Sequence, residues 1–292
     1  MFPSKWTQNA LPRYGFARLN VNDFPPRILY NDPDSQNVRG GERLAKKVGI
    51  VILGDEVLKA ETRESNIAYM LPLLNEWGAE VALCAILPDD VPTVVRHLRS
   101  FLAEVDLLIL TGGIGPTPDD ITREAVATVA RVPLVVHPEA RACLEAYYGK
   151  RMNAERMVMA HVPEGAVLIP NPLSAAPGFF VARMAVFPGI PRLLHEMFEW
   201  MKPLVEGKRG SRVTLYSSAP ESAYAAIMRE TLAAFPTVRI GSYPLLEGEY
   251  RVRVVFRAED FGHAAASADF FSERLQAAGM EISRRVEEGR DG

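Results

Sequence analysis

The chain has 292 residues, of which 48% are hydrophobic and 24% are charged, and its formal net charge is −3. This length suits one large domain or two moderate ones, with enough apolar residues for a hydrophobic core. The small negative charge gives no overall basic field for nucleic acid or an anionic membrane, and every apolar run is far shorter than the roughly 20 residues that span a bilayer. We therefore expect a cytoplasmic protein with no nucleic-acid partner and no membrane partner.

The first 46 residues differ in character from the rest of the chain. They contain five prolines and clusters of Asn and Asp, with no sustained hydrophobic period. This composition predicts an irregular N-terminal extension over residues 1–46. From residue 47 a regular alternation of apolar runs and helical patterns begins, and it predicts an α/β domain over residues 47–207.

The first half of this domain alternates strands with helices. Continuous apolar runs predict buried strands at residues 48–53, 81–87 and 105–110. Apolar residues spaced three and four apart predict helices at residues 67–77, 91–102 and 119–130. This order favours right-handed βαβ units and a mostly parallel sheet with helices on both faces.

The remaining elements are shorter, and the element order changes after a Gly-Lys-Arg-Gly linker at residues 207–210. Before the linker we expect a helical stretch, three short strands and a closing helix, at residues 138–160, 167–169, 179–183, 185–187 and 190–205. Beyond it we expect strand, helix, two strands and helix, at residues 213–217, 221–234, 238–243, 250–256 and 261–279. This second run predicts a small α+β domain over residues 211–285.

A glycine-rich loop, Thr111-Gly-Gly-Ile-Gly-Pro-Thr-Pro-Asp-Asp120, follows the third predicted strand. Ligands of parallel α/β sheets bind beyond the carboxyl ends of the strands. Glycines allow backbone N–H groups to turn inward into an anion-binding concavity, and the next helix adds the positive end of its dipole. The loop therefore predicts phosphate binding, with the candidate residues Thr111, Gly112, Gly113, Gly115 and Thr117.

Two carboxylates, Asp119 and Asp120, end this loop. Placed beside a phosphate they would repel it, and a divalent cation such as Mg²⁺, Mn²⁺ or Co²⁺ would relieve the repulsion. We therefore predict that one or both hold a metal that bridges to the phosphate. The alternative is a helix start, in which Thr117 is the N-cap, Pro118 occupies the first helical position and Asp120 completes a capping box.

Three further loops carry candidate residues. Gly54 and Asp55 end the first predicted strand, on the same rim as the glycine loop if the first and third strands are neighbours. With Asp119 and Asp120, Asp55 would make a metal-assisted phosphoanhydride hydrolase, and the alternative is a solvated turn. The other candidates lie in two turn-rich loops, namely Asn171 and Ser174 in the first and Pro188 and Gly189 in the second.

Taken in order, these segments resemble the motifs of the molybdenum-cofactor-biosynthesis (MoCF, MoaB/Mog-like) domain, in the branch found in competence/damage-inducible protein A (CinA). The matching segments are residues 54–58 with Asn66, 111–122, 171–179 and 187–191, and residues 241–244 are similar to the hallmark of a following KH-like domain. The resemblance extends from about residue 48 to about residue 282. Ala60 stands where the branch usually has Gly, and Pro118 where His or Lys is common.

The resemblance implies a three-layer α/β domain that binds molybdopterin or a nucleotide at the glycine loop, followed by a small KH-like domain. For the CinA branch it implies metal-dependent cleavage of the pyrophosphate in ADP-ribose-like molecules, here in a short form without the C-terminal amidohydrolase domain. The KH clamp needs a G-x-x-G spacing that the second domain lacks, so RNA is not expected.

Three functions stay open at this point. The first is a metal-dependent pyrophosphatase that acts on ADP-ribose, FAD or a similar dinucleotide. The second is a non-catalytic binder of molybdopterin, and the third is a regulatory or assembly module with a decayed site. We also expect a homo-oligomer of two or three chains.

Overall fold

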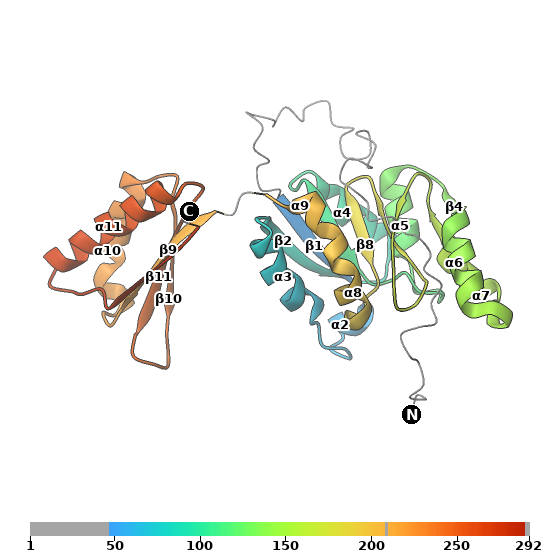
Figure 1. Cartoon of the computed structure of the whole chain (residues 1–292), viewed down its shortest axis with the longest axis horizontal. Helices are drawn as coiled ribbons and strands as arrows, with labels where there is room; N and C mark the ends of the chain where they lie inside the picture. The colour runs from blue at the N-terminus through green and yellow to red at the C-terminus, as the bar shows by residue number, and fades with distance from the viewer. Residues whose placement is uncertain (1–46, 208–209, 290–292) are drawn as a thin grey trace. The chain divides into compact units, whose positions relative to one another are not determined.

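The computed structural model describes residues 47–207 and 210–289. The predicted extension over residues 1–46 and the middle of the predicted linker lie outside the described residues. The chain divides into two compact units, with the division after Gly207. Figure 1 shows both units, and each is described by itself below.

The first unit is built on a six-stranded sheet of order β2-β1-β3-β8-β7-β6 (Figure 1). Strands β1, β2, β3 and β8 run parallel, and β7 runs antiparallel to both β8 and β6. The predicted α/β class with a mostly parallel sheet is thereby confirmed. The strands are β1 (Lys47–Leu53), β2 (Glu80–Leu87), β3 (Leu107–Thr111), β6 (Val167–Ile169), β7 (Gly178–Val181) and β8 (Met184–Phe187).

Helices cover both faces of this sheet because its central strands are apolar and buried at nearly every position. Along β1, Val51 and Leu53 pack in one core cluster with α4, α5 and α6, whereas Ile50 and Ile52 pack in a second with α3 and α8. The helices are α2 (Asp55–Leu58), α3 (Asn66–Glu76), α4 (Val91–Leu102), α5 (Thr122–Ala130), α6 (Pro138–Tyr148), α7 (Ala154–Met157), α8 (Pro191–Met197) and α9 (Lys202–Val205).

Several elements differ from the sequence prediction. Helix α5 begins at Thr122, three residues later than predicted. A two-stranded antiparallel sheet of β4 (Leu134–Val136) and β5 (His161–Pro163) was not predicted. The predicted closing helix over 190–205 is interrupted by a 3-10 turn at Phe198–Met201.

The second unit is a four-stranded antiparallel sheet of order β10-β11-β9-β12 with two helices. The predicted run of strand, helix, two strands and helix is present, and an additional strand, β12, completes the βαββαβ arrangement of ferredoxin-like domains. Its elements are β9 (Ser211–Ser217), α10 (Glu221–Ala234), β10 (Arg239–Pro244), β11 (Val252–Ala258), α11 (Phe261–Ala277) and β12 (Arg284–Glu288).

Both helices of this unit pack on the same face of its sheet. Tyr224 of α10 and Phe271 of α11 share one core cluster with alternate residues of the strands, such as Leu215, Val254 and Phe256. The other sheet face therefore carries no helix of this unit. Among the described residues of the whole chain, no helix combines the length and the apolar character needed to cross a membrane.

Candidate functional site

The candidate site lies where three neighbouring parallel strands end. Thr111 at the end of β3 pairs with Ile52 of β1 on one side and with Phe187 of β8 on the other. The segments that begin at Gly54, Gly112 and Pro188 therefore leave the sheet side by side. The first and third predicted strands are neighbours. This was the condition for the glycine loop and Asp55 to lie on the same rim.

Glycine is needed at several positions of this rim because a larger side chain would overlap neighbouring protein atoms. Gly112 has a φ of +102°, and a Cβ there would overlap the carbonyl oxygen of Leu53. Gly113 has a φ of +63°, and a Cβ there would overlap the Thr122 hydroxyl. A Cβ on Gly189 would lie 3.2 Å from the Cα of Gly112. Close packing thus explains these glycines without a ligand. This explanation was not among the alternatives drawn from the sequence.

Asp120 closes the glycine loop on itself. Its carboxylate accepts hydrogen bonds from the amides of Gly115 at 2.7 Å and Thr117 at 2.8 Å, and from the Thr117 hydroxyl at 2.6 Å. Because α5 begins only at Thr122, Thr117 is not its N-cap and Pro118 is not its first residue, so this part of the alternative is wrong. The predicted reciprocal bond from the Thr117 amide to Asp120 is present, but it lies within the loop. Both Asp120 oxygens already accept hydrogen bonds, which leaves this carboxylate poorly placed as a metal ligand.

The amides of the glycine loop differ in whether the protein supplies them with an acceptor. The Gly112 amide donates to the Phe187 carbonyl at 3.1 Å, and the Thr122 amide donates to the Gly113 carbonyl at 3.0 Å. Among the described residues, the amides of Gly113 and Ile114 have no acceptor. These two consecutive N–H groups follow directly from the end of β3.

A buried arginine contacts the carbonyl groups of the same loop. The Arg123 side chain is only 5% exposed and donates to the carbonyl oxygens of Ile114 and Gly115. Burial lowers the pKa of the guanidinium, and the nearby charge of Asp120 opposes that shift. Arg123 therefore fixes the loop and places a positive charge beside it. Sequence analysis missed this residue because no pattern distinguishes a buried arginine from an exposed one.

On the β1 side of the rim, Asp55 pairs with Asp89, which follows the end of β2. The Asp55 amide donates to the Asp89 carboxylate at 2.9 Å, and the Asp89 amide donates to the Asp55 carboxylate at 3.3 Å. Lys59 donates to Asp55 at 2.8 Å, and this hydrogen bond is the main reason that the pKa of Asp55 is lowered. The pKa of Asp89 is raised by burial, and further by the charges of Glu56, Asp55 and Asp119.

Asp119 is exposed, and hydrogen bonds from the Thr117 side chain and its own amide lower its pKa. The charge of Asp119 contributes to the raised pKa of Asp89, after burial and the charges of Glu56 and Asp55. No group of three or more His, Cys, Asp or Glu side chains in residues 47–207 or 210–289 is arranged to hold a metal ion. Asp89 was missed although it follows a strand end, the same signal that identified Asp55.

Asn66, the first residue of α3, connects the glycine loop to the loop after β8. Its side-chain amide donates to the Gly189 carbonyl at 2.9 Å and to the Thr111 hydroxyl at 3.4 Å. Asn66 is 5% exposed, and its Oδ1 has no hydrogen-bond partner among the described residues. An acceptor without a donor therefore lies at the shared end of β3 and β8.

Asn171 and Ser174 are used within their own loop. The Asn171 side chain accepts from the amides of Leu173 and Ser174, and it donates to the Ser174 hydroxyl at 2.7 Å and to the Ala176 carbonyl at 2.9 Å. These bonds make an Asx-type turn that holds the loop before β7. The structure therefore accounts for both residues by local structure.

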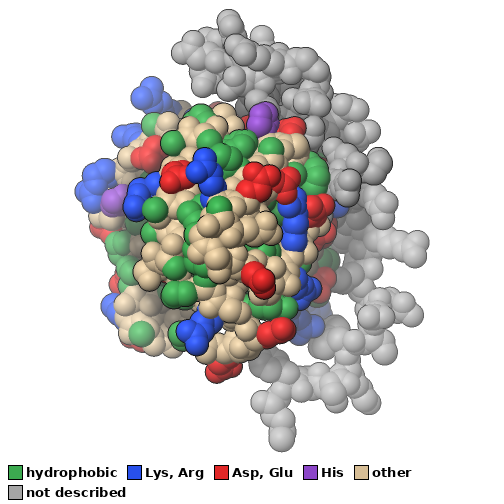
Figure 2. Space-filling model, turned by 90° about the vertical axis from the view of Figure 1, so that its left-hand side faces the viewer, with side chains coloured by type: hydrophobic (Ala, Val, Ile, Leu, Met, Phe, Trp, Pro, Cys, Tyr) green, Lys and Arg blue, Asp and Glu red, His purple; other side chains and the backbone are tan. Residues whose placement is uncertain are grey.

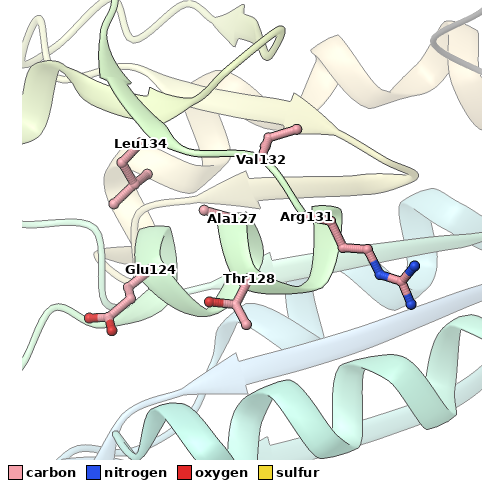
Figure 3. A pocket seen from close by; sticks show the side chains of 6 residues that line it. All are labelled: Glu124, Ala127, Thr128, Arg131, Val132 and Leu134. Atoms are coloured by element: carbon pink, nitrogen blue, oxygen red, sulfur yellow. The ribbon is translucent and has the colours of Figure 1, made fainter.

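A hollow in the first unit lies away from the rim, beside α5 and β4 (Figure 3). It is lined by Glu124, Ala127, Thr128, Arg131, Val132 and Leu134. None of the residues predicted from the sequence lines it, so it does not represent the predicted site.

Comparisons with known proteins agree with the division into two units. Residues 49–207 match the family described as "probable molybdopterin binding domain", and residues 211–283 match "FAD synthase, middle domain". A protein of Pyrobaculum calidifontis is 33% identical over 208 residues, which are 67% of this chain and 79% of the relative. A CinA-like protein of Desulfosudis oleivorans is 33% identical over 207 residues, which are 66% of this chain and 50% of the relative.

One solved structure is similar in both sequence and fold. It is a protein CinA of unknown function from Thermoplasma acidophilum, with 29% identity and a TM-score of 0.52. The match covers 55% of this chain and 99% of that one. The shared fold therefore amounts to about half of the chain.

Proposed function

The chain belongs to the family of probable molybdopterin-binding domains, and on this premise we propose that its first unit binds a phosphate-bearing nucleotide or pterin at the glycine loop. One observation carries the proposal: the consecutive amides of Gly113 and Ile114 have no acceptor among the described residues. The buried guanidinium of Arg123 donates to two carbonyl oxygens of the same loop, those of Ile114 and Gly115. Consecutive N–H groups near a positive charge and a helix N-terminus form a site that favours an anion.

The unpaired Oδ1 of Asn66 supports a binding site at the glycine loop. It also suggests that the ligand carries a hydrogen-bond donor. A buried polar atom without a partner costs about 1–3 kcal/mol, so a partner is expected at a functional site. Purine and pterin rings carry N–H donors that can satisfy the Asn66 Oδ1. A ligand with a phosphate at Gly113 and a ring near Asn66 would use both features.

Isothermal titration calorimetry with ADP-ribose, and with pyrophosphate alone, tests this proposal. Asn66→Ala should weaken ADP-ribose binding at least tenfold and change pyrophosphate binding little. The matched control is Asn153→Ala, which removes the N-cap of α7 away from the rim. The proposal fails if the wild type binds neither probe, or if both variants bind ADP-ribose equally well.

A second candidate function is metal-dependent hydrolysis of a pyrophosphate. The reciprocal hydrogen bonds between Asp55 and Asp89 support it, because they bring two carboxylates together on the rim, and one or two carboxylates with phosphate oxygens commonly hold a divalent cation. Asp55, Asp89 and Asp119 present the oxygen donors that Mg²⁺ and Mn²⁺ prefer, and Co²⁺ also accepts them. When bound, the metal would neutralise phosphate charge and lower the pKa of a water molecule.

In this function Asp119, with Asp55 or Asp89, would hold the cation, and the loop amides would hold one phosphate in place. Since no set of three such ligands is present in the described residues, the phosphate oxygens would complete the coordination, as is common for Mg²⁺. Release of AMP from ADP-ribose with Mg²⁺, Mn²⁺ or Co²⁺ would support hydrolysis. ADP-ribose binding without AMP release would instead support the non-catalytic binder. The absence of both ADP-ribose binding and AMP release would support a regulatory module.

Asp119→Asn and Asp120→Asn separate a catalytic role from a structural one. Asp119 is exposed and should affect turnover without changing the melting temperature. Asp120 holds three hydrogen bonds of the loop, so its variant should lower the melting temperature as well. Full turnover in the Asp119→Asn variant would contradict its assignment to the metal.

A further inference from the structure

The helix-free face of the sheet in the second unit is rich in arginine and tyrosine. Strand residues alternate between two faces, so the residues between those of the core cluster point to the helix-free face. Five of the nine arginines between residues 210 and 289 lie on it, although this part of the chain is acidic overall. We call this surface the arginine face, and its charged and aromatic members are Arg212, Arg239, Arg253, Arg257, Arg284, Tyr216 and Tyr243.

The strand register arranges these residues in two rows across the sheet. The first row is Tyr243, Arg253, Tyr216 and Arg284, and the second is Arg239, Arg257, Arg212 and Glu288. The row between them, Gly241, Val255, Thr214 and Val286, has no charged side chain. The outer rows are four residues apart along each strand, which corresponds to about 14 Å at ~3.4 Å per residue.

The arginines of the first row are held against the tyrosine rings. The Arg253 guanidinium lies 4.9 Å from the centre of the Tyr243 ring, and that of Arg284 lies 5.6 Å from the centre of the Tyr216 ring. Arg257 lies 5.9 Å from the Tyr243 ring and also donates to its hydroxyl at 3.3 Å. The rings and the charges are therefore ordered into one surface before any partner binds.

Few acids neutralise this surface. Arg212 pairs with Glu288 at 2.6 Å. Within the described residues, Arg253, Arg257 and Arg284 form no ion pair with an acid, and the Arg253 Nε is buried without a partner. The arginine face thus keeps most of its positive charge.

The acids of the second unit lie mainly elsewhere. Several are on the helices, including Glu221 and Glu230 of α10 and Asp269 and Glu273 of α11. Figure 2 shows the side of the molecule that carries the helices of this unit, where acidic and basic side chains are interspersed with hydrophobic ones. Arginines are therefore concentrated on the helix-free face, while many of the acids lie elsewhere in the unit. The total charge averages over both, so composition alone did not indicate this surface.

We propose that the arginine face binds single-stranded nucleic acid, with phosphates at the arginines and bases stacked on Tyr216 and Tyr243. A positive surface with one exposed and one partly buried tyrosine ring fits a partner that carries both repeated negative charge and aromatic faces. A duplex hides the faces of its bases, and an acidic peptide has no bases to stack. The separation of the two rows favours an oligomer over a single nucleotide. The absence of a G-x-x-G motif in this domain argues against binding by a KH clamp. It does not argue against binding on the face of a four-stranded sheet, which needs no such loop.

The test is fluorescence anisotropy of the full-length protein with fluorescein-labelled 12-nucleotide oligo(U) and oligo(dT). Either single strand should bind, and affinity should fall as salt rises, because phosphate contacts release counterions. A duplex of equal length should bind at least fivefold more weakly than a single strand. No binding of either oligonucleotide, or equal binding of the duplex, overturns the proposal.

Charge-reversal and ring variants locate the binding. Arg257→Glu and Arg284→Glu should each weaken binding about tenfold or more, and Tyr243→Ala should weaken it at least ~5-fold. Tyr243→Phe keeps the ring and should bind nearly as the wild type does. The matched control is Arg229→Glu on the exposed side of α10, which should lose less than twofold.

Equal losses in Arg229→Glu and Arg257→Glu would mean that binding follows total charge, and they would contradict the proposal. Tighter binding to vesicles that contain phosphatidylserine than to oligo(U) would contradict it too, since it would indicate a membrane surface. Melting temperatures within a few degrees of the wild type show that each variant is folded. Because the arginine face lies in the second unit, loss of ADP-ribose binding would leave this result unaffected.

Discussion

Replacing Arg123 by Met removes the charge and the hydrogen bonds to the glycine loop while keeping much of the side-chain volume. In the wild type the guanidinium donates to two carbonyl oxygens, those of Ile114 and Gly115. Methionine can donate to neither of them. The variant therefore separates the hydrogen-bonding role of Arg123 from simple filling of space.

The magnitude follows from these two bonds. A hydrogen bond to a charged group contributes about 1.5–3 kcal/mol, so two bonds correspond to roughly 3–6 kcal/mol. Burial lowers the pKa of Arg123, which shows that the buried charge carries a desolvation cost, and the variant recovers part of that cost. We expect Arg123→Met to lower the free energy of unfolding of the first unit by about 2–4 kcal/mol.

Urea unfolding followed by tryptophan fluorescence measures this change. Trp77 and Trp200 lie in the first unit, and residues 210–289 contain no tryptophan, so the signal does not report on the second unit. The control is Arg141→Met, which removes an exposed ion pair with Glu145 one helical turn away and should cost about 0.5 kcal/mol or less. If Arg123→Met costs no more than this control, Arg123 does not hold the loop.

Three further changes test other parts of the rim. Gly112→Ala should destabilise the first unit by about 3 kcal/mol or more in the same urea assay. Gly112 has a positive φ, and a Cβ there would overlap the Leu53 carbonyl. Near-normal stability of this variant would contradict the close packing. Ala60→Gly should stabilise it by about 0.5–1 kcal/mol, because Ala60 has a φ of +58°, and a loss of stability would show that the strain is absent. Asp89→Asn keeps the acceptor for the Asp55 amide but removes a charge that folding disfavours, since the pKa of Asp89 is raised in the folded protein. In EDTA its melting temperature should therefore exceed that of the wild type at pH 7, and the difference should vanish below pH 3.8, where Asp89 is neutral in both states; a difference that persists at low pH would contradict this reason.

The elements that the sequence predicted well are those with strong local signals. Helix α4 has its predicted bounds, and Asp90 caps it by accepting from the Thr93 amide at 2.9 Å. The family resemblance is confirmed by the match over residues 49–207. Strand β12 was missed because Arg284–Glu288 is mostly charged and exposed, so nothing local marks it as a strand. Its pairing with β9 depends on tertiary structure.

The site shows a similar division. The predicted loops that follow β1, β3 and β8 lie on one rim, because the carboxyl ends of neighbouring parallel strands meet there whatever the side chains do. The sequence could not show how the loop uses its own groups: Asp120 binds the loop amides, and the buried Arg123 binds the loop carbonyls. Ala60 has a left-handed backbone conformation, which glycine adopts at lower cost than alanine.

The central claim is that the amides of Gly113 and Ile114 receive a phosphate. Their chemical shifts in a TROSY spectrum of isotope-labelled protein, recorded while ADP-ribose is added, test it most directly. The account predicts that these two amides shift most, and that the Gly112 amide, already bonded to the Phe187 carbonyl, shifts less. Saturating ADP-ribose that leaves the Gly113 and Ile114 signals unchanged while others move would contradict it.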